Sequence, residues 1–476
     1  MNNEVRSTEA GSTPNSTGSS PEKPHAVTPL SRFKLFCYGV TDMPLHFALT
    51  PVLIFVPKYY TSELGLTLIV VGNILLLARI MDVFTDPLIG YWSDRTRTPW
   101  GRRRPWIVAG MPIMTVSFYL LFLPQGEIDA WYLFACVMGL YLALTMILIP
   151  YYSWAAELSD DYSERSRITG WRSAIGIIGN IAAQGVPILF LVFFGYGGDK
   201  AVMTILGVMM VILLPLAVLI TVTQVPETDD YVSSVTPIRK GLKLMWRNGP
   251  FKRLIAALMI GSTAFNITTP LYAFFVGYVL GAPTMTIVML AFFYLSNLLG
   301  IPFWVQLSNK IGKHRAYAAS FILIGCAHPL YIFHGWGDFW WMIPITIVSG
   351  FAGGSFAALP NSMKADVIDL DTMMSGDNRA ASFFATWSFT AKMSAAIGGW
   401  IALNILGLMG FDPQLGADNS ESHMLGLRVL FTVPPAILFF VAAGIVWNYP
   451  ITAERHARMR EAIARRNARR ALAALA

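Results

Sequence analysis

Charged residues are scarce in this chain of 476 residues: Asp, Glu, Lys and Arg make up 13% of it, whereas 55% is hydrophobic. A soluble globular protein averages about 25% charged residues, so the composition excludes an ordinary soluble domain. Cysteine is also scarce. The three cysteines, Cys37, Cys136 and Cys326, lie in apolar segments without metal-ligand spacing, which indicates small buried side chains rather than a disulfide framework or a zinc motif.

Two further features are missing. The sequence has no glycine-rich phosphate loop with its lysine, so nothing in it indicates a nucleotide-driven function or a bound cofactor. The first thirty residues are rich in Ser, Thr, Pro, Asn and Gly and contain no apolar run. We therefore expect residues 1–31 to form a disordered cytoplasmic tail rather than a signal peptide.

Apolar runs of helix length are abundant instead. Each is long enough for a membrane-spanning helix of about 20 residues. We predict twelve such helices, at residues 33–58, 66–92, 105–123, 130–154, 168–196, 203–224, 253–280, 285–307, 315–334, 339–362, 380–409 and 425–448. The fold class expected is an all-α, multi-pass membrane protein, located in the plasma membrane (a bacterial inner membrane).

Basic residues are distributed unevenly between the loops. The loops after the second, sixth and eighth predicted helices are basic, whereas those on the other side carry almost no Lys or Arg. The positive-inside rule then predicts that both termini are cytoplasmic. Because this topology already accounts for the basic residues, we expect no nucleic-acid partner.

The chain contains a parallel internal repeat. Ser93-Asp94-Arg95 and the run at 101–104 recur about 210 residues later as Ser308-Asn309-Lys310 and the run at 312–315. Such a repeat suits two six-helix bundles of the major facilitator type. The predicted bundles span residues 32–225 and 251–450, joined by a cytoplasmic linker at 226–250, and the chain is expected to act as a monomer.

The segment after the second bundle is different in composition. Residues 451–476 alternate Arg with Ala and Leu, which predicts a basic cytoplasmic helix. Such a helix would be attracted to anionic lipids of the inner leaflet. A merely solvated tail is the alternative.

Two carboxylates in the second apolar segment carry most of the functional argument. Asp82 and Asp86 are four residues apart, so they share one face of a helix. An unpaired carboxylate in hydrocarbon costs about 2.5–3.5 kcal/mol, so the pair needs a compensating partner. Counting along the helices places Asp42, Asp82, Asp86, Thr145 and Lys392 in one layer, roughly 10–18 Å from the cytoplasmic boundary.

The oxygens in this layer suit a hard monovalent cation. We predict that Asp82, Asp86, Thr85 and Thr145 bind Na⁺, with Lys392 as the counter-ion when the site is empty. A shared proton is an alternative, because one carboxylate raises the pKa of the other. A static buried salt bridge among Asp82, Asp86 and Lys392 is a further alternative, although it gains little over an apolar pair.

Four other residues are candidates for substrate contact. Asp42 is a carboxylate in the first apolar segment and would accept hydrogen bonds from a polar substrate. Arg172 either binds substrate or extends to the interface. Tyr152 and Trp387 are aromatic candidates for the wall of a cavity.

Charged residues at the predicted cytoplasmic ends suggest gating loops. They would bridge the two bundles in one state and separate in another. The candidates are Asp94, Arg95, Arg102, Glu157, Arg165, Asp366 and Arg379.

The motif at residues 79–90 (RIMDVFTDPLIG), followed by TPWGRRRPWI at 98–107, resembles the glycoside–pentoside–hexuronide:cation symporter family of the major facilitator superfamily, typified by the melibiose permease. The resemblance runs from about Phe33 to the end of the last predicted helix. It implies a cation site at Asp82, Thr85, Asp86 and Thr145, with Lys392 nearby. It also implies a sugar site at Asp42 and Arg172.

The sequence departs from the melibiose permease at two matched positions. Thr85 stands where that protein has Asn, which leaves Na⁺, Li⁺ and H⁺ open as coupling ions. Leu148 stands where it has a second sugar-binding Asp, and Tyr152 where it has Trp. The stretch at 448–455 is similar to the sodium-dependent lysophosphatidylcholine symporters of the same family.

Cation-coupled symport of a glycoside is therefore the leading hypothesis, with symport of a lysophospholipid as the alternative. A membrane phospho-alcohol transferase, with aspartates holding Mg²⁺, is a remote alternative because Asp82 and Asp86 lie deep. A sensor that transports nothing is another. The expected partners are a small-molecule substrate and the lipid bilayer.

Overall fold

The computed structural model describes residues 30–159, 162–195, 197–227, 248–375, 380–451 and 458. In these residues the regular structure is helical, apart from one bridge between Thr98 and Gly101. Twelve stretches of the described chain are long and apolar enough to cross a membrane, as the sequence predicts. Nearly all of the two predicted tails and most of the predicted linker lie outside the described residues.

The first six spans are formed by α1 (Arg32–Gly39), α2 (Asp42–Ser62), α3 (Leu68–Arg95), α4 (Arg104–Phe122), α5 (Ala130–Glu157), α6 (Tyr162–Phe194) and α7 (Asp199–Gln224). The last six are formed by α9 (Gly249–Phe274) with η1 (Phe275–Val279), η2 (Pro283–Met285) with α10 (Thr286–Ile311), α11 (Lys313–Ala327) with η3 (His328–Phe333), α12 (Phe339–Ser375), α13 (Ala380–Leu408), and α14 (Glu421–Trp447), which follows the short η4 (Gly416–Asp418).

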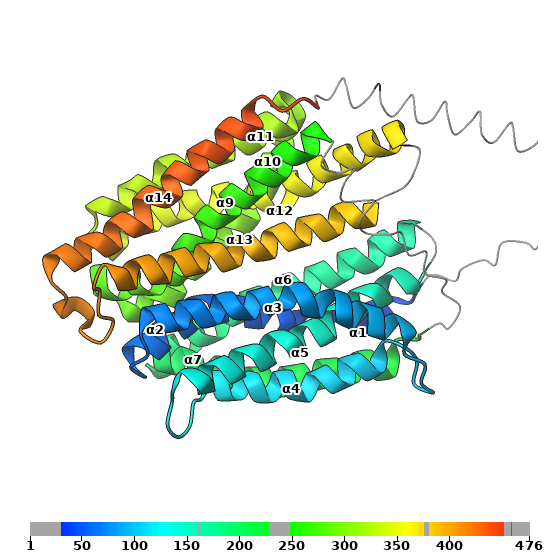
Figure 1. The fold of residues 1–476 in the computed structure, drawn as a ribbon, viewed down its shortest axis with the longest axis horizontal. Helices are drawn as coiled ribbons and strands as arrows, with labels where there is room; N and C mark the ends of the chain where they lie inside the picture. The colour runs from blue at the N-terminus through cyan, green and yellow to red at the C-terminus, as the bar shows by residue number, and fades with distance from the viewer. Residues whose placement is uncertain are drawn as a thin grey trace, which may run out of the picture.

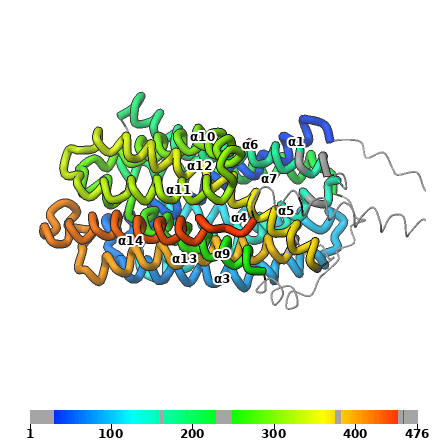
Figure 2. Tube along the Cα trace, turned by 90° about the horizontal axis from the view of Figure 1, so that it is seen from above, coloured from blue at the N-terminus to red at the C-terminus, as the bar shows by residue number. Residues whose placement is uncertain are grey.

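The helices form two bundles that lie side by side. Figure 1 shows α1–α7 in one bundle and α9–α14 in the other, and Figure 2 shows that both sets run along one common axis. The bundles meet mainly where α13 packs on α3, with further contacts of α2 on α9 and α6 on α10. α1 begins and α14 ends on the same side of the molecule (Figure 1).

Local sequence signals fix where several helices begin. At five starts, a side-chain oxygen of the residue before the helix accepts a hydrogen bond from a backbone N–H, which satisfies one donor of the first turn. These capping residues are Ser31, Thr67, Asp129, Asn248 and Ser420.

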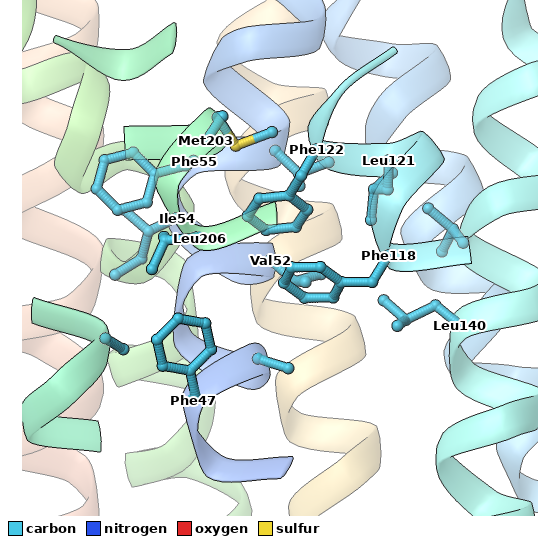
Figure 3. Close-up of a cluster of buried hydrophobic side chains, with 14 of the residues drawn as sticks. Phe47, Val52, Ile54, Phe55, Phe118, Leu121, Phe122, Leu140, Met203 and Leu206 are labelled. Carbon is cyan, nitrogen blue, oxygen red and sulfur yellow. The ribbon is translucent and has the colours of Figure 1, made fainter. Parts of the chain in front are cut away.

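Apolar side chains from α2, α4, α5 and α7 fill the interior of the first bundle. Phe47 and Phe55 of α2, Phe118 and Phe122 of α4, and Met203 of α7 are each at most 1% exposed. Figure 3 shows these side chains converging between the four helices. This packing makes the bundle a firm support for the polar side chains that α2 and α5 also carry.

Two glycines allow α6 to approach α2 closely. A Cβ atom on Gly179 would lie 2.2 Å from the carbonyl oxygen of Met43, and one on Gly176 would lie 2.7 Å from Oδ2 of Asp42. Small residues at helix contacts permit such approach in membrane proteins. The glycines therefore determine how near α6, which carries Arg172, comes to Asp42.

Gly179→Ala is expected to destabilise the protein by about 1–3 kcal/mol, because the added methyl group meets rigid backbone. Gly185→Ala on the same helix is the matched control, since nothing lies within 4 Å of its added Cβ. We expect the melting temperature in detergent to fall for the first variant only. Equal melting temperatures for the two variants would contradict the close approach of α2 and α6.

The first span differs from the single helix predicted at 33–58. α1 ends at Gly39 and α2 begins at Asp42. Between them, the hydroxyl of Thr41 bonds to α7, 3.3 Å from the carbonyl oxygen of Ala217 and 2.8 Å from the hydroxyl of Thr221. Asp42 therefore lies in the first turn of a helix, where the helix dipole stabilises a carboxylate.

Three residues predicted to lie in loops are in helices. Glu157 is the last residue of α5, Arg165 lies in the first turns of α6, and Asp366 lies inside α12, which continues to Ser375. The apolar stretch ends near residue 362, but a buried stripe of Met363, Val367 and Leu370 continues beyond it. An amphipathic helix needs only such a stripe, so the prediction that α12 ends at 362 was wrong.

Candidate functional site

Asp82 and Asp86 of α3 meet Thr145 of α5 and Lys392 of α13. The Lys392 ammonium lies 2.5 Å from Oδ2 of Asp86 and 3.6 Å from Oδ2 of Asp82. The Thr145 hydroxyl donates to Oδ1 of Asp86 at 3.1 Å and reaches Oδ1 of Asp82 at 3.5 Å. We call these four residues, with Arg79, the carboxylate cluster. Lys392 is its link between the two bundles.

Arg79 is the second positive side chain of the cluster, and it was not predicted as a site residue. Its Nη1 lies 3.4 Å from Oδ2 of Asp82, one helical turn away, and its guanidinium stacks 4.2 Å from the ring centre of Tyr141. Two positive and two negative side chains therefore face one another. The only sequence signal was the i, i+3 spacing of Arg79 and Asp82.

The exposure of the cluster is uneven. The Asp82 side chain is 3% exposed, whereas those of Asp86 and Lys392 are 23% and 26% exposed. Thr85, on the same helix face, has a buried hydroxyl that finds no hydrogen-bond partner in the described part of the chain. The cluster thus offers two carboxylates, one engaged hydroxyl and one unused hydroxyl, a set of hard oxygens that suits a small cation.

Asp42 lies in a second polar group, which we call the Asp42 cluster. His46 and Arg172 lie 3.4 Å and 3.9 Å from Oδ2 of Asp42, and the Tyr152 hydroxyl donates to Oδ1 at 3.4 Å. The Arg172 guanidinium lies 4.1 Å from the centre of the Tyr152 ring. The predicted residues Asp42, Arg172 and Tyr152 are therefore together, on three helices of the first bundle.

One carboxylate oxygen in this cluster has ion-pair neighbours but accepts no hydrogen bond. Among the described residues, Oδ2 of Asp42 is buried without a hydrogen-bond partner, as is Nε of Arg172. His46, which was not predicted, sits one turn after Asp42 on α2 and is 36% exposed. An acceptor and a donor thus face each other without being bonded, which suits a polar ligand that would satisfy both.

The charged residues after α3 form an ion-pair network within the first bundle. Arg103 pairs with Glu157 and with Asp94, each at 2.6 Å, and Arg102 pairs with Glu157 at 3.0 Å. Burial acts to lower the pKa of the Arg103 guanidinium. Hydrogen bonds and charge from Glu157 and then Asp94 outweigh that effect and raise the pKa above its ordinary value, so Arg103 stays charged.

The other predicted gating residues that the structure describes lie outside this ion-pair network. Arg95 is exposed and stacks on Tyr91 at 3.6 Å, and Arg165 donates to the Ser159 carbonyl at 2.6 Å. Asp366 pairs with Lys313 of the same bundle at 2.7 Å, which mirrors the Glu157 network of the first bundle. Arg379 lies outside the described residues. Bridging of the two bundles by these residues stays a prediction.

Trp387 lies apart from the other three predicted substrate residues. It is on α13, and its ring centre is 4.8 Å from the ammonium of Lys364 on α12. Lys364 was not predicted, because it falls just beyond the apolar stretch that was assigned to the tenth span.

The family model described as "MFS/sugar transport protein" matches residues 37–453. The chain is 24% identical over 431 residues to a glucuronide carrier protein homolog of Escherichia coli, covering 87% of this chain and 92% of that protein. It is 27% identical over 480 residues to sodium-dependent lysophosphatidylcholine symporter 1 of Gallus gallus, covering 91% and 89%.

A solved structure shows the same fold. The inward-facing, unoccupied structure of a bacterial homolog of the human lysosomal transporter Spinster superposes with a TM-score of 0.63 at 14% identity, over 89% of this chain and 100% of that one. The prediction of twelve helices in two bundles of the major facilitator type is confirmed.

Proposed function

Since the chain belongs to the MFS/sugar transport protein family, we propose that it is a cation-coupled symporter that carries a glycoside together with Na⁺ or H⁺. The chain is a multi-pass plasma-membrane transporter and not an enzyme, which removes the phospho-alcohol transferase from consideration. Transport is proposed to proceed by alternating access between the two bundles, with both termini cytoplasmic.

The carboxylate cluster is the observation that carries this proposal. Lys392 reaches from the second bundle to two carboxylates of the first. A cation binding between Asp82 and Asp86 would compete with that ammonium and loosen the link between the bundles. Binding of the ion is thereby coupled to the equilibrium between conformations, which is what symport requires.

On this proposal the ammonium of Lys392 exchanges with a bound cation, and the salt bridge is not a static element of the fold. A purely structural pair gains little over apolar residues. It also gives no reason for the partial exposure of Asp86 and Lys392, or for the unused hydroxyl of Thr85.

The Asp42 cluster is proposed to bind the substrate. Oδ2 of Asp42 and the Nε–H of Arg172 form no hydrogen bond among the described residues. They fit the hydroxyl groups of a sugar, which donate and accept at once. A lysophospholipid is the second candidate, favoured by Leu148 in place of an acidic ligand and by the similarity to the lysophosphatidylcholine symporter of Gallus gallus.

A thermal-shift panel on the purified full chain tests the proposal. We expect a glycoside such as melibiose or 4-nitrophenyl β-D-glucoside to raise the melting temperature more in NaCl than in choline chloride, because a ligand stabilises the state that it binds. Stabilisation by lysophosphatidylcholine alone, in a Na⁺-dependent way, would reject the glycoside. Absence of any cation dependence would reject coupling to Na⁺, and a matching pH series then tests H⁺.

A further inference from the structure

Lys364 is a buried cation that the proposed mechanism does not use. It lies on α12 and is 4% exposed. Its ammonium donates one hydrogen bond, to Oδ1 of Asn361 at 3.1 Å. It also lies over two rings of α13, 4.0 Å from the centre of Phe384 and 4.8 Å from that of Trp387.

The described residues provide no carboxylate for this ammonium. Lys392 has two carboxylate partners, and the nearest acidic residue along α12, Asp366, pairs with Lys313. A lysine ammonium has three donors, and a single amide oxygen accepts from Lys364. Burying an ammonium without a counter-ion is costly, and aromatic rings offset only part of that cost. The Lys364 ammonium therefore has hydrogen-bond donors and a charge that a bound anion would satisfy.

Lys364 also lies between two helices that do not pack closely on each other. α12 packs mainly on α10 and α11, whereas α13 packs mainly on α9 and on α3 of the other bundle. The Lys364 side chain thus crosses between two helices that are not principal packing partners. Trp387 precedes Lys392 on α13 by about 7.5 Å of helix, so Lys364 lies close to the layer of the carboxylate cluster.

α13, whose rings Lys364 contacts, is the helix that places this cation near the first bundle. Figure 1 shows α13 on the side of its bundle that faces the first bundle, and Phe384 is 53% exposed. An anion bound at Lys364 would therefore lie beside α13, the helix of the second bundle that packs on α3 of the first.

We propose that Lys364 binds a negatively charged group of the transported substrate, a carboxylate or a phosphate, so that the carrier prefers a substrate with an anionic group to a neutral sugar. This inference rests on the proposed function. The shared chemistry has two sources, the carboxylate of a uronic acid glycoside and the phosphate of a lysophospholipid. Asp42 would bind the polar part of the substrate from one bundle while Lys364 binds the anion from the other.

Two matched probe pairs test this inference by direct binding to the full chain in NaCl. 4-Nitrophenyl β-D-glucuronide and 4-nitrophenyl β-D-glucoside differ in one carboxylate, and lysophosphatidic acid and a monoacylglycerol with the same acyl chain differ in one phosphate. We expect the wild type to bind the charged member of one pair at least about tenfold more tightly, the effect of one hydrogen bond to a charged group. The pair that shows the preference identifies the source.

Variants then assign the preference to one side chain. Lys364→Gln should remove it while affinity for the neutral probe is retained, and Lys364→Arg should keep it. Lys310→Gln is the matched control, because Lys310 is an exposed lysine at the end of α10, and it should behave as wild type. A preference that survives in Lys364→Gln overturns the inference, as does a wild type that favours the neutral members or binds neither charged probe.

The readout of cation binding separates this inference from the proposed function. Na⁺-dependent stabilisation should be the same in Lys364→Gln as in the wild type, which also shows that the variant is folded. If Na⁺ promotes binding of the neutral glucoside and no charge preference exists, only the inference about Lys364 fails. If Na⁺ has no effect on any probe or on the free protein, the Na⁺-coupled form of the proposed function fails instead.

Discussion

Asp86→Asn is expected to reduce cation-gradient-driven accumulation in proteoliposomes to the level of protein-free vesicles. Asp86 is the carboxylate nearest to Lys392, at 2.5 Å, and is more exposed than Asp82. The amide supplies neither the charge that a cation needs nor a strong partner for the ammonium. Asp82→Asn should have the same effect on uptake but should also lower stability, because it removes one member of a buried pair, which costs about 3–5 kcal/mol.

Uptake of the ligand chosen by the thermal-shift panel gives the measurement, with Na⁺-induced stabilisation as a second readout. Glu127→Gln is a suitable control, because Glu127 is an exposed acidic residue in the turn after α4 and its loss changes the net charge equally. Normal gradient-driven uptake by both Asp82→Asn and Asp86→Asn would remove the carboxylate cluster from the coupling mechanism.

Asp42→Asn is expected to weaken substrate binding by about 10- to 100-fold, the range for a lost hydrogen bond to a charged group, and to leave cation binding intact. The carboxylate is 1% exposed, and no described residue forms a hydrogen bond with its Oδ2 atom. Asn keeps the shape of the side chain but loses the charge that faces Arg172 and His46.

Titration of the same ligand in NaCl, followed by titration of Na⁺ without ligand, distinguishes the two sites. The assignment predicts that only the first titration changes. If substrate affinity is unchanged and Na⁺ affinity falls, Asp42 belongs to the ion site rather than to the substrate site.

Sequence reasoning works best where a pattern is local. The twelve spans follow from apolar length, and the grouping of Asp82 with Asp86 follows from helical spacing. The end of α12 was wrong because only a narrow buried stripe continues past residue 362. The break before Asp42 depends on hydrogen bonds between Thr41 and α7, a contact between segments far apart in the chain.

The difference between local patterns and contacts of distant segments also applies to the two candidate sites. Counting depth along the helices brought Asp82, Asp86, Thr145 and Lys392 to one layer, and the structure joins them. Depth alone also placed Asp42 in that layer, although its partners are His46, Arg172 and Tyr152. Depth does not give rotation about the helix axis, which decides the partners, so sequence reasoning missed His46 and Arg79. It missed Lys364 because that residue lies beyond the apolar stretch assigned to the tenth span.

The charge balance of the carboxylate cluster has a consequence for membrane voltage. Arg79 and Lys392 offset Asp82 and Asp86, so the ion-free site has no net charge. On the proposed mechanism, a bound monovalent cation gives the loaded site one positive charge, and moving it through 100 mV is worth about 2.3 kcal/mol. The membrane potential would then act on the carboxylate cluster when a cation is bound, and not when Arg79 and Lys392 alone balance its carboxylates.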